Sequence, residues 1–240
     1  MTAPAQQSLL ALQDLDSAID RQRHRRVSLP ERAQLADVDR RLAGDGEARR
    51  HLQQAVSEVA RRQAALEAEL DAAEGQAANL ERRLAGGEAG TGRDMAAMTA
   101  SLDHLRQRIS DLEDRVLAVL DERAPLDHQV ATADDQLAQL QGQRGTLAGV
   151  IARHEEAIDG ELALLEADRP ALEEAVPEDL RAEYQRLRRR LDGVAVARLV
   201  GSRCDGCHLT LSATELDRIR RLPEDALVHC EQCGRILVRS

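Results

Sequence analysis

Two long stretches of this chain repeat apolar residues with a seven-residue period, one on each side of a glycine-rich segment. Apolar positions alternate spacings of four and three over residues 52–84 and again over residues 98–165. This period keeps one narrow stripe facing a partner helix, so it predicts coiled-coil helices. The segment between them, residues 85–93, holds four glycines, and each costs a helix about 1 kcal/mol relative to alanine. We predict an antiparallel hairpin with its tip at about 85–93; an intermolecular coiled coil is the alternative.

Breaks are expected within the two arms. Pro30, the cluster at residues 44–46 and Pro125 are predicted to kink or interrupt a helix. The apolar phase before Pro30 differs from the phase after it, so the first 26 residues are predicted to form a separate helix packed near residues 150–170. Four polar side chains occupy the predicted seam, where such groups commonly set register rather than bind a cofactor: Gln63, Arg123, Arg144 and His154.

All four cysteines lie near the C-terminus in two CxxC pairs. Cys204 and Cys207 form the first pair, and Cys230 and Cys233 the second. Thiolates two residues apart on a tight turn can reach one ion, and two such turns supply the four sulfurs of a closed, tetrahedral structural zinc site. The sequence therefore predicts one structural Zn²⁺. Since a full sulfur shell leaves no open position for water, hydrolytic chemistry is disfavoured.

Two disulfides are the alternative use of these cysteines. Disulfides belong to oxidising compartments. The N-terminus has no basic start, and charged residues soon break its apolar run, so no signal peptide is expected. No uncharged stretch approaches the roughly 18 residues that span a bilayer. We expect a cytoplasmic protein with reduced cysteines and no membrane association.

Short elements are predicted around the cysteines. A helix from Glu178 to about Leu191 should be followed by a strand over residues 194–200. Ser212 and Glu215 match a capping box that opens a helix to about Arg221. Gly206 and Gly234 are predicted to supply positive φ in the two cysteine turns. The expected fold class is mainly α: a coiled-coil hairpin over residues 1–177, then a basic helix and a small zinc ribbon with a few short strands over 178–240.

Charge is distributed unevenly. Residues 1–180 carry a balance of −14 and residues 181–240 a balance of +4, within a net charge of −10. A tetrathiolate zinc centre would itself carry −2, so the basic bias is mild. Candidate phosphate contacts at this end are Arg186, Arg188, Arg189, Arg190, Arg198, Arg203, Arg218, Arg220, Arg221, Arg235 and Arg239.

The C-terminal motifs resemble those of a bacterial family. The runs Cys204–Ser212 and Cys230–Leu237, preceded by the segments that begin at Tyr184 and Val194, are similar to the C4-type zinc-ribbon family that carries a long N-terminal antiparallel coiled-coil hairpin. The resemblance implies a hook-like, non-enzymatic nucleic-acid-binding or adaptor protein. Some members of the family are linked to flagellar or secretion systems and an alternative sigma factor. The family's metal ligands correspond to the four cysteines here.

These features bear on three classes of function. A zinc-binding adaptor acting through protein–protein contacts is favoured, because long charged helices offer much surface and little pocket. A DNA- or RNA-binding regulator using the basic ribbon end is the alternative. The net negative charge of the chain and the scarcity of aromatic residues oppose it. An enzyme is not expected, since no phosphate-binding loop, catalytic constellation or small-molecule pocket is evident.

Overall fold

The computed structural model describes residues 3–87, 90–223 and 226–239. The chain forms two compact units, one made of Met1–Ala33 with Leu147–Ser240 and the other of Gln34–Thr146. The domain boundary at residue 177 stays a prediction.

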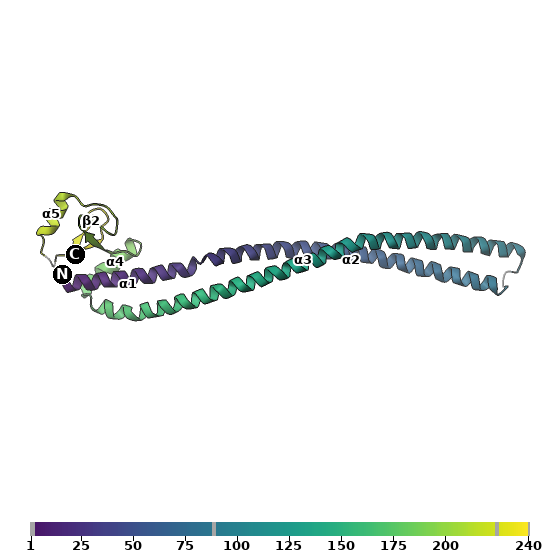
Figure 1. The fold of residues 1–240 in the computed structure, drawn as a ribbon, viewed down its shortest axis with the longest axis horizontal. Coiled ribbons are helices and arrows are strands. Elements are labelled where there is room, and N and C mark those ends of the chain that lie inside the picture. The colour runs from purple at the N-terminus through teal and green to yellow at the C-terminus, as the bar shows by residue number, and fades with distance from the viewer. Residues whose placement is uncertain (1–2, 88–89, 224–225, 240) are drawn as a thin grey trace. The chain divides into compact units, whose positions relative to one another are not determined.

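The Gln34–Thr146 unit is a helical hairpin. The helices α2 (Pro30–Ala85) and α3 (Gly92–Glu174) contribute its two antiparallel arms (Figure 1). Buried residues from both arms form one cluster along the seam, comprising Val59, Leu66, Ala73, Leu112 and Val119. These are positions of the two heptad series, so the intramolecular hairpin predicted from the sequence is confirmed.

The tip of the hairpin lies where the glycines predict it. The helix α2 ends at Ala85, and the Gly86 N–H still donates to the Arg82 carbonyl at 2.9 Å, before Gly87 turns the chain with φ of 69°. Thr91 and Asp94 open α3 reciprocally: the Asp94 N–H donates to Thr91 Oγ1 at 3.2 Å, and the Thr91 N–H donates to Asp94 Oδ2 at 3.1 Å. Residues 88 and 89 of the predicted tip lie outside the described residues.

The prediction that residues 44–46 and Pro125 interrupt the arms was wrong, and the alternative that they kink a helix stays a prediction. The helix α2 continues through Gly44 and Gly46, and α3 continues through Pro125. The cost of a helical glycine or proline is local, whereas buried residues of both arms pack together along the seam. Next to Pro125, Leu126 packs against the buried cluster of the hairpin, so tertiary packing overrides the local preference.

The polar seam residues are paired across the arms. Arg123 Nη1 donates to Gln63 Oε1 at 3.0 Å, and Arg144 Nε donates to Asp39 Oδ1 at 2.8 Å. Pairing of this kind agrees with a role in register.

In the other unit, α1 (Ala3–Val27) packs on the C-terminal part of α3. Side chains join the two helices, with Gln22 Nε2 donating to Glu161 at 2.6 Å and Arg26 Nε donating to Asp159 at 2.7 Å. A short break follows α1, and Pro30 is the first residue of α2, where its missing N–H is not needed. The separate first helix, packed near residues 150–170, is therefore confirmed.

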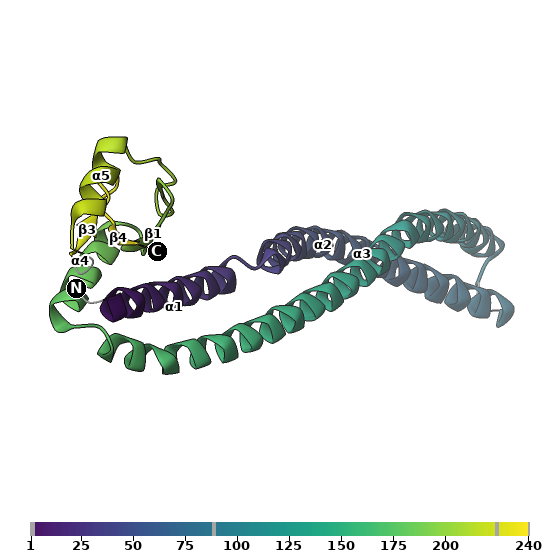
Figure 2. The same cartoon turned by 60° about the vertical axis from the view of Figure 1, so that its left-hand side comes forward.

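The C-terminal part of this unit is a small sheet with two short helices. The helix α4 (Glu178–Arg190) leads into β1 (Val196–Val200) and β2 (Arg203–Cys204); α5 (Ala213–Arg221) precedes β3 (Val228–His229) and β4 (Ile236–Arg239) (Figure 2). The strand order is β2-β1-β4-β3, with β1 and β4 parallel and both outer pairs antiparallel. The Ser212 side chain accepts the Glu215 N–H at 3.1 Å, so the Ser212 half of the predicted capping box is confirmed, whereas Glu215 Oε1 accepts the Glu231 N–H instead.

A shared core joins the sheet to the helices. Leu9 and Leu12 of α1 are fully buried with Tyr184 and Leu187 of α4 and Ile236 of β4. The ribbon therefore packs directly against the N-terminal helix. No helix of the described residues is long and apolar enough to cross a membrane.

Candidate metal centre

The four cysteines lie on two matching turns at the ends of short strands. Cys204 ends β2 and Cys230 follows β3. In each turn the residue after the second cysteine donates its N–H to the carbonyl of the first: His208 to Cys204 and Gly234 to Cys230, both at 2.8 Å. We call these turns the first knuckle (residues 204–208) and the second knuckle (residues 230–234).

The two knuckles bring all four sulfur atoms together. The sulfurs lie within 4.8 Å of one another. The Cys204 and Cys233 sulfurs are 4.0 Å apart, and those of Cys207 and Cys230 are 3.9 Å apart. A tetrahedral zinc with Zn–S bonds of about 2.3 Å needs sulfurs about 3.8 Å apart, whereas a disulfide needs about 2.05 Å. The cysteines are free thiols positioned to bind a metal ion.

The surrounding groups shift the pKa values of the cysteines in different directions. Burial raises the pKa of Cys230 to about 12 and also raises the pKa of Cys204. Burial acts in the same direction on Cys233, but the polar interactions with Arg235 and with the thiols of Cys230 and Cys207 together outweigh it and lower that pKa. Since a metal binds thiolates, a metal ion must displace protons from the buried pair.

One glycine in the knuckles has a different role from the predicted one. Gly234 has φ of 73°, as predicted, but Gly206 does not have a positive φ; His208 takes the left-handed conformation instead, with φ of 61°. Gly206 is needed for space, because a Cβ there would lie 2.6 Å from Arg235 Cδ and 2.9 Å from Ala197 Cβ.

Glu215 ties α5 to the second knuckle. Its side chain is buried, and Oε1 accepts the Glu231 N–H at 3.2 Å. Of the two flanking histidines, His208 is exposed and His229 Nε2 lies 3.6 Å from Glu183 Oε1. Among the described residues, the candidate metal cluster consists of the four cysteines without either histidine.

The eleven arginines named as candidate phosphate contacts are mostly engaged within the chain. Eight have partners: Arg186 with Glu183, Arg188 with Asp20, Arg198 with Asp14, Arg218 with Glu231, Arg221 with Asp217, Arg203 with the His208 carbonyl, Arg235 with the Val194 carbonyl, and Arg239 with the carbonyls of Ile219 and Leu222. Within the described part of the chain, Arg189, Arg190 and Arg220 have no such partner. The assignment of these arginines to a nucleic acid stays a prediction.

Sequence reasoning missed the polar residues that attach the ribbon to α1. Gln13 Oε1 accepts the N–H groups of Ala195 and Val196 at 2.7 and 3.1 Å, and its Nε2 donates to the Gly193 carbonyl at 3.0 Å. Asp16 is 1% exposed. The available signal was the spacing of Asp16, which follows Leu9 and Leu12 on the apolar face of α1 and interrupts it with a charge.

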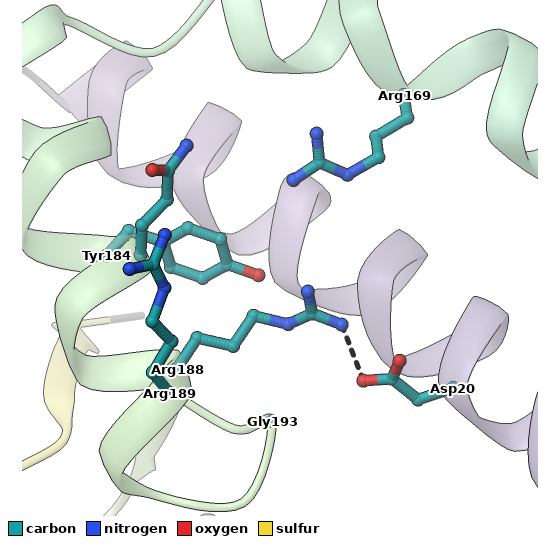
Figure 3. A pocket seen from close by; sticks show the side chains of 7 residues that line it. Asp20, Arg169, Tyr184, Arg188, Arg189 and Gly193 are labelled. Carbon is teal, nitrogen blue, oxygen red and sulfur yellow. Dashed lines mark hydrogen bonds and ion pairs between the residues drawn. The ribbon is translucent and has the colours of Figure 1, made fainter.

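A polar pocket of 470 Å³ lies beside this attachment, between α1, α3 and α4. Figure 3 shows Arg188 reaching from α4 to Asp20, where the two side chains pair at 2.5 Å. Arg169 and Tyr184 also line the pocket, and both donate to the buried Asp16 carboxylate, each at 2.8 Å. Of the charged groups that line the pocket, Asp20 and Arg188 pair with each other, and Arg169 pairs with Asp16 behind the lining.

Comparison with known proteins assigns both parts of the chain. Residues 12–192 match the model of the CT398-like coiled coil hairpin domain, and residues 203–237 match the C4-type zinc ribbon domain. The chain belongs to the CT398-like hairpin family. The resemblance seen in the sequence is therefore confirmed, as is the mainly helical fold class.

Several relatives of this family are similar over nearly their whole length. The Mycobacterium tuberculosis protein Rv2229c, itself uncharacterised, is 31% identical, over 98% of this chain and 95% of its own. A structurally characterised Mycobacterium smegmatis protein shares the fold with a TM-score of 0.87 at 23% identity, covering 100% and 99% of the two chains. CT398 from Chlamydia trachomatis shares it with a TM-score of 0.70 at 22% identity, covering 98% of each chain.

Proposed function

We propose that this protein is a non-enzymatic adaptor whose zinc ribbon and coiled coil bind partner proteins. Cys204, Cys207, Cys230 and Cys233 would hold one structural Zn²⁺, whose full sulfur shell leaves no position for a reacting water. The spacing of the sulfurs, which suits a shared metal ion rather than two disulfides, supports a cytoplasmic location. Elemental analysis of full-length protein purified with reductant should find one zinc per chain.

The observation that carries the adaptor proposal is the surface chemistry of the ribbon. Eight of the eleven candidate arginines are engaged internally, while two large apolar side chains at the first knuckle are exposed: Val200 at 59% and Leu209 at 52%. Val200 pairs with Arg203, which in turn bridges to Thr210, so the two apolar residues belong to one end of the ribbon. Exposed apolar side chains gathered at one end of a small domain favour a protein partner over a polyanion.

Point substitutions test the proposal better than removal of the ribbon. Deleting residues 194–240 would uncover Leu9 and Leu12 of α1, because these side chains pack in the shared core. Full-length protein carrying Val200→Asp and Leu209→Asp should lose proteins that co-purify with the wild type, as measured by quantitative pull-down. Leu164→Asp is the matched control, since Leu164 is 73% exposed on α3. Unchanged capture by the double variant would reject the ribbon as the docking end.

Nucleic-acid binding is the second candidate, favoured by the three arginines that have no partner in the described residues. If it is correct, full-length protein should bind labelled DNA or RNA at about 50 mM salt, and affinity should fall as salt rises. Substituting Arg189, Arg190 and Arg220 together with alanine should weaken binding and reduce its salt dependence. Fluorescence anisotropy measures both. Absence of binding by the wild-type protein at low salt would exclude this candidate.

A further inference from the structure

Arg235 lies between the two knuckles and is attached to both. It follows Gly234 directly, and its carbonyl accepts the Cys230 N–H at 2.9 Å, which closes the second knuckle. Its side chain is half-buried and crosses to the first knuckle, where its stem occupies the space left open by the missing Cβ of Gly206. A single residue therefore contributes backbone to one pair of cysteines and packing to the other.

The guanidinium of Arg235 is held in place by the chain segment before β1. Its Nε donates to the Val194 carbonyl at 2.9 Å. Val194 itself is next to Ala195, whose N–H is bound by Gln13 of α1. The orientation of the guanidinium is thus set by groups outside the knuckles, which makes its position independent of the sulfurs.

The charges around the sulfurs are mostly negative, and they favour a cation at the position of Arg235. Four thiolates and one Zn²⁺ carry a charge of −2, and the acidic residues Asp205, Glu215 and Glu231 lie in or against the knuckles. The Nε atom of Arg235 lies 3.3 Å from the position that a Cβ of Gly206 would take, so its positive charge lies beside the first knuckle. Groups around a metal site that orient its ligands commonly change metal affinity by about 10- to 100-fold.

We propose that Arg235 is a positioning residue of the metal centre, which locks the two knuckles together through its contact with Gly206 and offsets thiolate charge by placing its guanidinium beside the first knuckle. This inference rests on the proposed zinc site. It assigns Arg235 to the metal rather than to a phosphate, although the sequence alone grouped it with the candidate nucleic-acid contacts.

The test compares full-length wild type with Arg235→Met, Arg235→Lys and the control Arg218→Met. Arg218 pairs with the exposed Glu231 on the same ribbon at 2.7 Å. Zinc transfer to a coloured chelator should be on the order of 10-fold faster in Arg235→Met. In the cobalt-loaded proteins, the thiolate-to-metal charge-transfer band should move to lower energy, because the thiolates have lost a neighbouring positive charge. Arg235→Lys should restore part of both effects, and Arg218→Met should match the wild type.

Gly206→Ala provides a second variant that keeps every charge. A methyl group at residue 206 would displace the Arg235 stem, so the band should shift and zinc release should accelerate as in Arg235→Met. This variant decides the question if Arg235→Met does not fold.

Each contrary outcome is distinguishable. Faster zinc release with an unmoved charge-transfer band in both variants would mean that Arg235 only packs, and would overturn the proposal. Unchanged release and an unchanged band would overturn it as well. A wild-type protein that lacks stoichiometric zinc would reject the zinc site itself, and this inference with it.

Discussion

Asp16 connects three helices through one buried carboxylate. Arg169 of α3 and Tyr184 of α4 both donate to it at 2.8 Å, and Arg188 Nη1 lies 3.6 Å away. A buried charge is costly unless it is paired and hydrogen-bonded, and here both conditions are met. The buried Asp16 carboxylate is therefore stabilised by Arg169, Tyr184 and Arg188, and it supplies their shared counter-charge or hydrogen-bond acceptor.

Replacing Asp16 with asparagine should destabilise the protein strongly. The change leaves Arg169 and Arg188 without their shared buried counter-charge, and we expect a loss of about 3 kcal/mol in the free energy of unfolding. Urea denaturation followed by far-ultraviolet circular dichroism measures it. Asp20→Asn is the matched control: Asp20 also pairs with Arg188, but its side chain is 43% exposed, so a loss below about 1 kcal/mol is expected. Equal losses of stability for the two variants would contradict the role of the buried Asp16 carboxylate as the main counter-charge.

Tyr184 should resist ionisation in the folded protein. Burial raises its pKa, and the hydrogen bond to Asp16 and the charge of Asp16 raise it further. Tyr184 is the only aromatic residue in the chain, so phenolate absorbance reports on it alone. The absorbance should appear only as the protein unfolds, whereas a free tyrosine titrates near a pKa of about 10.

The raised pKa of Tyr184 also determines how the free energy of unfolding changes with pH. Because the folded pKa of Tyr184 lies above the unfolded value, its contribution to stability is complete below pH of about 10 and is lost as the pH rises further. In that range the unfolded state has released the phenolic proton and the folded state has kept it, so this group lowers the free energy of unfolding by at most about 1.4 kcal/mol per pH unit. Tyr184→Phe should remove this slope in urea titrations followed by circular dichroism.

At the scale of elements, the arms of the hairpin carry glycines that packing does not require. Gly44 and Gly46 are helical, and a Cβ at either position would meet nothing within 4 Å. Their helix is held by the seam rather than by local preference. Their backbone freedom in the unfolded chain therefore reduces stability without any compensating contact.

Alanine at Gly44 and Gly46 should stabilise the hairpin by about 1 kcal/mol per site. The readout is the midpoint of urea unfolding, followed by circular dichroism. Gly193→Ala should act in the opposite direction, because Gly193 has φ of 87° and its Cβ would lie 3.0 Å from Asp20 Oδ2. If the helical substitutions lowered stability, the glycines would have a packing or bending role that their surroundings do not reveal.

At the scale of the molecule, the ribbon and α1 form one structural module. Leu9 and Leu12 are buried in the same cluster as Val196 and Ile236, which lie 184 or more residues later in the sequence. Gln13 adds hydrogen bonds to the backbone that leads into β1. Unfolding of the ribbon should therefore destabilise α1, which belongs to the same unit.

Removal of zinc should unfold the ribbon while most of the helix persists. Structural zinc supplies roughly 10–16 kcal/mol in small zinc-binding peptides, and the ribbon is too small to fold on apolar burial alone. After chelation, the far-ultraviolet signal should fall only slightly, whereas Tyr184 fluorescence should change because its core partners Val196 and Ile236 are lost. An unchanged Tyr184 signal after complete zinc removal would show that the core does not need the metal.

Local patterns in the sequence were sufficient for the hairpin, its tip, the cap of α5 and the clustered cysteines. Each follows from a short-range rule: the seven-residue period, the cost of glycine in a helix, Ser212 three residues before Glu215, or two residues between thiols. Such rules failed at Pro125 and residues 44–46, where the local cost of a break was outweighed by packing along the whole arm.

The partners of single side chains depended on the tertiary structure. Nothing in the spacing of arginines distinguishes Arg188, paired with an aspartate 168 positions away, from Arg189, which has no partner in the described residues. The steric need for glycine at Gly206 and the hydrogen bonds of Gln13 likewise arise between segments remote in sequence. Periodicity and spacing record how a chain folds on itself locally, but which charges neutralise one another is decided only when distant elements pack together.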